Sequence, residues 1–105
     1  MLTLLLLGHL LTYHWSSRAV LNANCGTPLP NVTPYIGCYV KDVKGDYDVY
    51  MDEWYKGKPG GAYTMKHETA HIFCEITGTK DEVHQGKWPK GFLEVENIRI
   101  FLSQN

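Results

Sequence analysis

The sequence lacks several features that would place it in a broad class at once. Its leucine-rich stretch from Met1 to Tyr13 is shorter than the roughly 20 apolar residues that a membrane-spanning helix requires. The formal net charge is −1, and acidic and basic residues are interspersed. The sequence therefore contains no basic cluster of the kind that binds nucleic acid. Repeats and low-complexity segments are also missing, which argues against a solenoid or a disordered protein.

Cysteine is scarce, with three residues in a chain of 105. Cys25 and Cys38 flank a proline-rich loop and could form a disulfide, which would leave Cys74 free. Three reduced thiols are equally compatible with this count, so the cellular compartment stays open. We expect no essential disulfide.

The leucine-rich N-terminal segment has no Lys or Arg of the kind that begins a secretory signal. Two small residues, Ser17 and Ala19, do follow at a plausible cleavage distance, but the signal-peptide interpretation of residues 1–19 is weak. We expect residues 1–13 to form a helix that packs on a sheet or against a larger assembly.

One run of residues does carry readable chemistry: His67-Glu68-Thr69-Ala70-His71, an H-E-x-x-H motif. Residues four apart on a helix share a face, so His67 and His71 can bring two imidazole nitrogens onto one Zn²⁺. Glu68 lies at the flank of that face, where a carboxylate can accept a proton from a water on the metal. The motif predicts a zinc hydrolase. The alternative is a polar helix face whose histidines bond to water or to nearby carboxylates.

The residues around the motif favour a buried, rigid helix over residues 61–77. Gly78 follows where helices commonly end. The apolar positions recur with helical spacing. The side chains predicted to line the buried side are those of Met65, Ile72, Phe73 and Ile76, with Ala62 and Thr69 beside them.

At this motif the chain resembles the zincin metallopeptidases, and the resemblance covers the motif helix and its neighbours. Zincins have an antiparallel strand above the cleft, the H-E-x-x-H helix beneath it and a third zinc ligand downstream. By resemblance, His67 and His71 would bind Zn²⁺, and Glu68 would be the general base of peptide hydrolysis. The resemblance also implies a peptide or protein substrate.

Three downstream residues are candidates for the third zinc ligand, and the sequence around each one resembles a different zincin branch. His84 would give a three-histidine site as in metzincins, although the metzincin glycine three residues after the motif is Cys74 here. Asp81 follows Gly-Thr-Lys, which resembles the Gly-Thr-x-Asp element of aspzincins. Glu96 resembles the ligand glutamate of gluzincins. We rank His84 first, because imidazole is the commonest neutral zinc ligand and Gly86 permits a tight turn. If Glu96 or Asp81 binds the metal, His84 could instead donate to the oxyanion.

The remaining segments predict one α+β domain over residues 1–105. The resemblance implies that this domain is a minimal zincin-like fold. Residues 35–55 read as a β-hairpin around Lys44-Gly45-Asp46, because aromatic and β-branched residues flank this turn. Residues 92–102 are ambiguous, and their spacing slightly favours a helix over a strand.

Two other functions stay open. The protein could be a non-catalytic component of a larger assembly that keeps a zincin scaffold and contacts its partners through the N-terminal segment. Four protein ligands would then coordinate any zinc and leave no open position for water. The number of protein ligands therefore distinguishes this hypothesis from a catalytic site. A zinc hydrolase could also act on a non-peptide amide, because the motif dictates the activated water and not the bond attacked.

Overall fold

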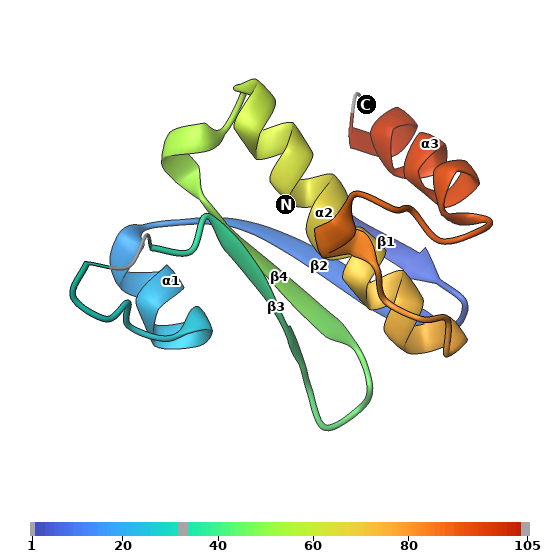
Figure 1. Cartoon of the computed structure of the whole chain (residues 1–105), viewed down its shortest axis with the longest axis horizontal. Helices are drawn as coiled ribbons and strands as arrows, with labels where there is room; N and C mark the ends of the chain where they lie inside the picture. The colour runs from blue at the N-terminus through green and yellow to red at the C-terminus, as the bar shows by residue number, and fades with distance from the viewer. Residues whose placement is uncertain (1, 32–33, 104–105) are drawn as a thin grey trace.

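A four-stranded mixed sheet forms the centre of the fold, with the strand order β1-β2-β4-β3 (Figure 1). The computed structural model describes residues 2–31 and 34–103. The strands are β1 (Leu2–Leu6), β2 (His9–Ser16), β3 (Gly37–Lys41) and β4 (Tyr47–Asp52). The α-helices are α1 (Arg18–Cys25), α2 (Pro59–Thr77) and α3 (Phe92–Ser103). Two short 3₁₀ helices are η1 (Glu53–Tyr55) and η2 (Val83–Gln85). The predicted α+β class is confirmed.

The leucine-rich segment forms β1 and β2, so the prediction of an N-terminal helix is wrong. The two strands pair antiparallel around a turn at Leu7 and Gly8, whose φ angles are +49° and +86°. Two consecutive positive φ values are typical of the tight turns that join hairpin strands. Burial alternates along β1, where Leu4 and Leu6 are buried and Leu5 is 67% exposed. A run of leucines does not reveal this alternation of buried and exposed side chains, because apolar residues occupy both faces of the strand. Leucine by itself also favours a helix.

The predicted hairpin is present, with strands shorter than residues 35–55. β3 and β4 pair antiparallel, with Tyr39 opposite Val49, and Gly45 lies in the turn with a φ of +88°. β4 also pairs with β2, and this pairing is parallel. The parallel pairing joins the two hairpins into one sheet. It leaves β1 and β3 as the edge strands of the sheet that the described residues form.

The two faces of the sheet carry different helices (Figure 1). Side chains of β4 that point to α2, such as Val49 and Met51, are fully buried. On the opposite face, Cys38 of β3 forms a disulfide with Cys25, the last residue of α1. The sequence analysis left open whether these two cysteines are bonded and expected no essential disulfide; the structure contains the bond. The return of α1 across the sheet brings the cysteines together, which their spacing in the sequence does not reveal. Cys74 is free and buried.

Helix α2 carries the motif and ends as predicted, at Gly78 in the left-handed conformation with a φ of +70°. It begins at residue 59, two positions before the predicted start, with Pro59 in the first turn, where a missing N–H costs nothing. Of the side chains predicted to be buried, Ala62 is exposed and Ile76 is partly buried. The buried ones are those of Met65, Thr69, Ile72 and Phe73.

The ambiguous C-terminal segment is a helix, as the slight preference indicated. Phe92 at the start of α3 is fully buried, and its ring centroid lies 5.9 Å from that of Phe73 and 5.6 Å from that of Trp88. These aromatic contacts hold α3 beside α2. No helix in the described part of the chain combines the length and apolarity that crossing a membrane requires.

Candidate metal centre and its cleft

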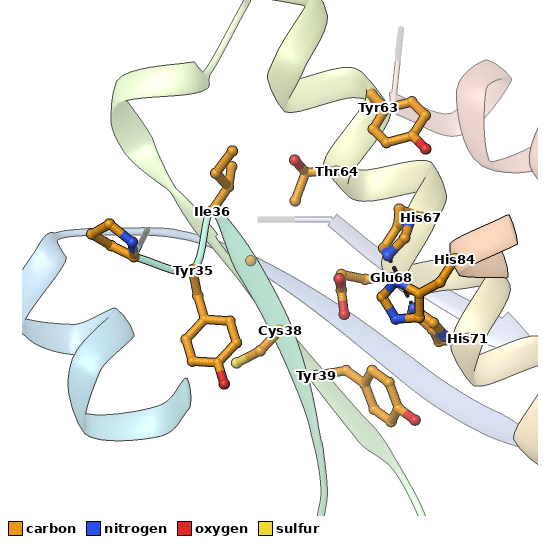
Figure 2. A pocket seen from close by; sticks show the side chains of 12 residues that line it. Tyr35, Ile36, Cys38, Tyr39, Tyr63, Thr64, His67, Glu68, His71 and His84 are labelled. Carbon is orange, nitrogen blue, oxygen red and sulfur yellow. Dashed lines mark hydrogen bonds between the residues drawn. The ribbon is translucent and has the colours of Figure 1, made fainter. Parts of the chain in front are cut away.

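Three histidines gather on one side of a cleft (Figure 2). His67 and His71 lie one turn apart on α2, and His84 comes from η2. One ligand nitrogen from each histidine lies within 4.8 Å of the other two. The ring centroids are 4.5 Å, 4.7 Å and 5.0 Å apart. The structure therefore brings together the three residues that the sequence analysis ranked first as metal ligands.

The chain after α2 turns back so that His84 reaches the motif. Gly78 and Gly86 adopt left-handed conformations on either side of this segment, with φ values of +70° and +76°. Val83, next to His84, is 1% exposed and belongs to the hydrophobic core. Burial of Val83 anchors η2, and His84 remains exposed at the cleft.

Asp81 lies behind the histidines as a partner of His71. Its Oδ2 is 2.5 Å from Nδ1 of His71, and its Oδ1 accepts the backbone N–H of Val83 at 3.1 Å. Partial burial raises the pKa of Asp81, but the hydrogen bonds from His71 and Val83 outweigh it and lower the pKa overall. The ionised carboxylate makes Nδ1 of His71 the donor and leaves its Nε2 lone pair for a metal. Asp81, considered above as a ligand, is instead placed to orient one.

The arrangement of the two motif histidines suits a cation. Nε2 of His67 lies 3.0 Å from Nε2 of His71. Burial lowers the pKa of His67, and the neighbouring His71 and His84 lower it further, so its neutral form is favoured. Nδ1 of His67 is buried without a hydrogen-bond partner among the described residues. The two Nε2 atoms face each other, and a metal bound between them would accept a lone pair from each. Three imidazoles suit zinc and several other transition metals.

Glu68 lies beside the histidines in the same cleft and is 8% exposed. Burial raises its pKa, the nearby His71 lowers it and the Asp81 carboxylate raises it, with a net upward shift. Gly37 of β3 lies close to this side chain: a Cβ at Gly37 would be 3.7 Å from Cγ of Glu68 and 2.5 Å from Cγ2 of Thr64. A glycine at this position therefore lets β3 approach α2 directly over the glutamate.

Known proteins do not identify this site. Comparisons with protein-family models, curated proteins and solved structures gave no significant match. The function therefore has to be argued from the side chains of the cleft and their geometry.

Glu96, the third candidate ligand, lies away from the histidine group. Its carboxylate oxygens accept hydrogen bonds from Nε and Nη2 of Arg99 at 2.6 Å and 2.8 Å. Both residues are 4% exposed, and Nη1 of Arg99 contacts the sulfur of Met65. This buried ion pair occupies the glutamate, so Glu96 is not placed to bind the metal. The sequence analysis did not consider Arg99; the spacing of three residues, typical of helix ion pairs, is the signal that could have indicated it.

The cleft has a volume of about 590 Å³ and lies between α2 and the segment that leads into β3. The sequence analysis did not single out several of its lining residues. Tyr63 lies four residues before His67 on the same helix face, a spacing that could have indicated it. The ring centroid of Tyr39 is 6.3 Å from that of His71. Burial, followed by nearby carboxylates, raises the pKa of Tyr39, which keeps its hydroxyl protonated.

Proposed function

We propose that this protein is a zinc-dependent peptidase of the zincin type. His67, His71 and His84 would bind Zn²⁺, and Glu68 would act as the general base. One observation carries this proposal: three histidine nitrogens within 4.8 Å of one another share a cleft with a buried glutamate. The sequence motif and the arrangement of these side chains support the same chemistry.

Zn²⁺ at this centre would supply a Lewis acid that acidifies a water molecule and polarises the carbonyl of the substrate. Glu68 then accepts the proton of the attacking water on its carboxylate and passes it to the leaving amine. The raised pKa of Glu68 suits both tasks, because a base and acid with a pKa nearer to neutrality exchanges protons more readily. Asp81 holds the imidazole of His71 in one tautomer throughout.

The number of ligands favours catalysis over a structural role. A structural zinc site normally has four protein ligands, whereas a catalytic site keeps one position for water or substrate. The group that the described residues form contains three, and all three histidines line the cleft. This supports an enzyme in preference to the non-catalytic assembly component.

The position of β3 supports a peptide substrate over another amide. Three of its residues, Gly37, Cys38 and Tyr39, line the cleft, and among the described strands β3 pairs with β4 alone. An edge strand can bind an extended peptide through main-chain hydrogen bonds. A peptide added to β3 would pass over Glu68 and the three histidines.

Elemental analysis of protein purified without chelator tests the centre. We expect one zinc per chain in the wild type and in Glu68→Gln, and loss of zinc in His67→Ala and His84→Ala. His14→Ala is the matched control, because His14 pairs with Asp48 outside the site and its loss should leave zinc bound. Absence of zinc from the wild type, even after zinc is added back at neutral pH, would contradict the proposal.

Hydrolysis of a mixed peptide library tests the mechanism. Wild type and His14→Ala should cleave, whereas Glu68→Gln should be slower by a factor on the order of 10²–10⁴. If zinc-loaded Glu68→Gln cleaves as fast as the wild type, Glu68 is not the base.

A further inference from the structure

The cleft beyond the metal centre is lined by uncharged residues. Among the described residues that line it, Glu68 supplies the only carboxylate, and none is Lys or Arg. Tyrosines stand on both sides of it, as Figure 2 shows for Tyr35 and Tyr63. The uncharged lining residues are Pro34, Tyr35, Ile36, Gly37, Cys38, Tyr39, Tyr63 and Thr64.

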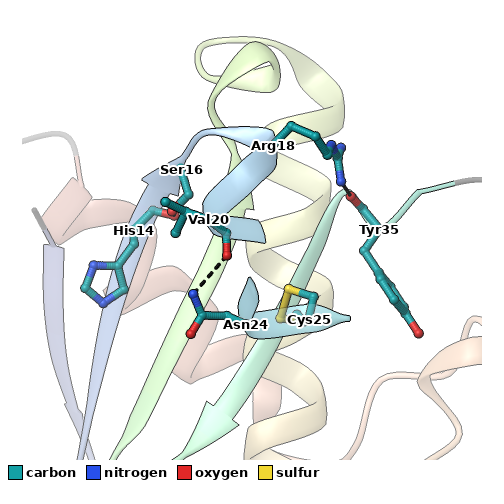
Figure 3. Close-up of a disulfide and its surroundings, with 8 residues drawn as sticks. His14, Ser16, Arg18, Val20, Asn24, Cys25 and Tyr35 are labelled. Atoms are coloured by element: carbon teal, nitrogen blue, oxygen red, sulfur yellow. Dashed lines mark hydrogen bonds between the residues drawn. A yellow bond between two sulfur atoms is a disulfide. The ribbon is translucent and has the colours of Figure 1, made fainter. Parts of the chain in front are cut away.

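Helix α1 holds the wall that leads into β3. Nη1 of Arg18, the first residue of α1, donates to the backbone carbonyl of Tyr35 at 2.8 Å. Nη2 of the same side chain donates to Oδ2 of Asp52 at 2.7 Å, and the backbone N–H of Asp52 donates to the carbonyl of Ile36 at 2.8 Å. Figure 3 shows Arg18 and Cys25 at the two ends of the helix, with Arg18 reaching Tyr35.

The disulfide supplies the second attachment of this wall. Cys25 at the end of α1 is bonded to Cys38, which lines the cleft three residues after Tyr35. The backbone of residues 35–38 is therefore fixed by hydrogen bonds from Arg18 and Asp52 and by a covalent bond at Cys38. A wall that is already ordered loses little conformational entropy when a ligand packs against it.

The opposite wall and the floor are also closely packed. Thr64 is 8% exposed, and its hydroxyl donates to the carbonyl of Gly60 at 2.8 Å. The close approach of Gly37 to Thr64 closes the space between the strand and the helix. The remaining volume, about 590 Å³, lies within the range of roughly 300–1,000 Å³ that is typical of small-ligand pockets.

We propose that this cleft selects peptides with a large uncharged side chain, aromatic or aliphatic, beside the scissile bond. That side chain packs against Tyr35 and Ile36. The selectivity rests on the proposed peptidase function and adds the class of substrate to it. A Lys or Glu side chain in the same place loses its water, and none of the described residues that line this wall carries a charge to pair with it. An apolar side chain gains by burial.

Binding to zinc-loaded Glu68→Gln tests this selectivity without cleavage. The probes are blocked hexapeptides that are identical except for one central residue: Phe, Leu, Lys or Glu. Calorimetry should show the Phe and Leu peptides binding about tenfold to a hundredfold more tightly than the Lys and Glu peptides. Equal affinity for all four peptides, or no binding of any of them, would overturn the inference.

Charge placed on the wall should reverse the preference. In the Glu68→Gln background, Ile36→Glu is expected to favour the Lys peptide over the Phe peptide. Tyr35→Glu is a second variant that should fold in any case, because this side chain is 53% exposed. Leu29→Glu is the matched control, since Leu29 belongs to the same loop, is 72% exposed and does not line the cleft. Leu29→Glu should still bind the Phe peptide more tightly than the Lys peptide.

The two proposals fail in different ways. If Tyr35→Glu still prefers the Phe peptide to the Lys peptide, this wall is not the source of the selectivity. That conclusion would hold even if the wild type cleaves peptides in a Glu68-dependent manner. Absence of cleavage by the zinc-loaded wild type would contradict the peptidase function. The binding preference of Glu68→Gln would still decide whether the cleft selects uncharged side chains.

Discussion

One carboxylate, that of Asp81, links the two segments that carry the histidines. Its Oδ2 is 2.5 Å from Nδ1 of His71 on α2, and its Oδ1 accepts the N–H of Val83 at the start of η2. His84 follows Val83 directly. Asp81 therefore sets the tautomer of one histidine and the position of the turn that presents another.

Removing this carboxylate should weaken metal binding. Asp81→Ala leaves Nδ1 of His71 and the N–H of Val83 without their acceptor, so we expect zinc affinity to fall about tenfold to a hundredfold. Competition with a chromophoric chelator at pH 7.5 measures this. Glu82→Ala is the matched control, because Glu82 pairs with Lys87 and not with a histidine. Unchanged zinc affinity in Asp81→Ala would show that Asp81 does not orient His71.

Glu96 should matter for stability and not for the metal. Glu96→Leu leaves the buried guanidinium of Arg99 unpaired, which should destabilise the fold by roughly 3–5 kcal/mol. The double variant Glu96→Leu/Arg99→Met should recover much of this loss, because it removes both buried charges. Urea denaturation measures both changes. Elemental analysis should find zinc in every folded variant, and loss of zinc from the double variant would return Glu96 to the list of ligands.

Gly37 should tolerate no side chain while Thr64 keeps its methyl group. The Cβ of Gly37→Ala would lie 2.5 Å from Cγ2 of Thr64 and 3.1 Å from the carbonyl oxygen of Tyr50. We expect this variant to be about 1–3 kcal/mol less stable than the wild type. Thr64→Ser removes Cγ2 and keeps the hydroxyl, so the double variant should regain part of the loss. A Gly37→Ala variant as stable as the wild type would show that β3 can move away from α2.

The buried hydroxyl of Tyr13 should make the fold sensitive to alkali. Burial raises its pKa to about 12 from 10.0, although the hydrogen bond with Thr69 opposes the shift. The neutral form is therefore favoured in the folded state. Its contribution is fully present below pH 10 and is lost as pH rises towards 12, at about 1.4 kcal/mol per pH unit.

Tyr13→Phe isolates this contribution. We expect the variant to be about 1 kcal/mol less stable at pH 8, because it loses one hydrogen bond. Between pH 10 and pH 12 its stability should fall less steeply than that of the wild type. Urea denaturation across this pH range is the measurement, with Tyr63→Phe as a control for loss of an exposed hydroxyl. Parallel curves for Tyr13→Phe and the wild type would contradict the expectation.

Local sequence by itself determined the features that depend on neighbours a few residues apart. The helical spacing of His67 and His71 predicted the shared face that they occupy on α2. Gly78 predicted the end of that helix, and Gly45 predicted the turn of the second hairpin. Each of these signals reflects backbone geometry within one or two turns of chain, which the residues specify directly.

Only the tertiary structure decided which distant segments meet. The nearly uniform leucines of β1 do not show which side chains face the core, so the N-terminal strands became clear only through the pairing of β1 with β2 and of β2 with β4. The choice among His84, Asp81 and Glu96 depended on the return of the chain after α2 and on the pairing of Glu96 with Arg99. These contacts depend on packing and on charges that are far apart in the sequence, so local spacing does not predict them.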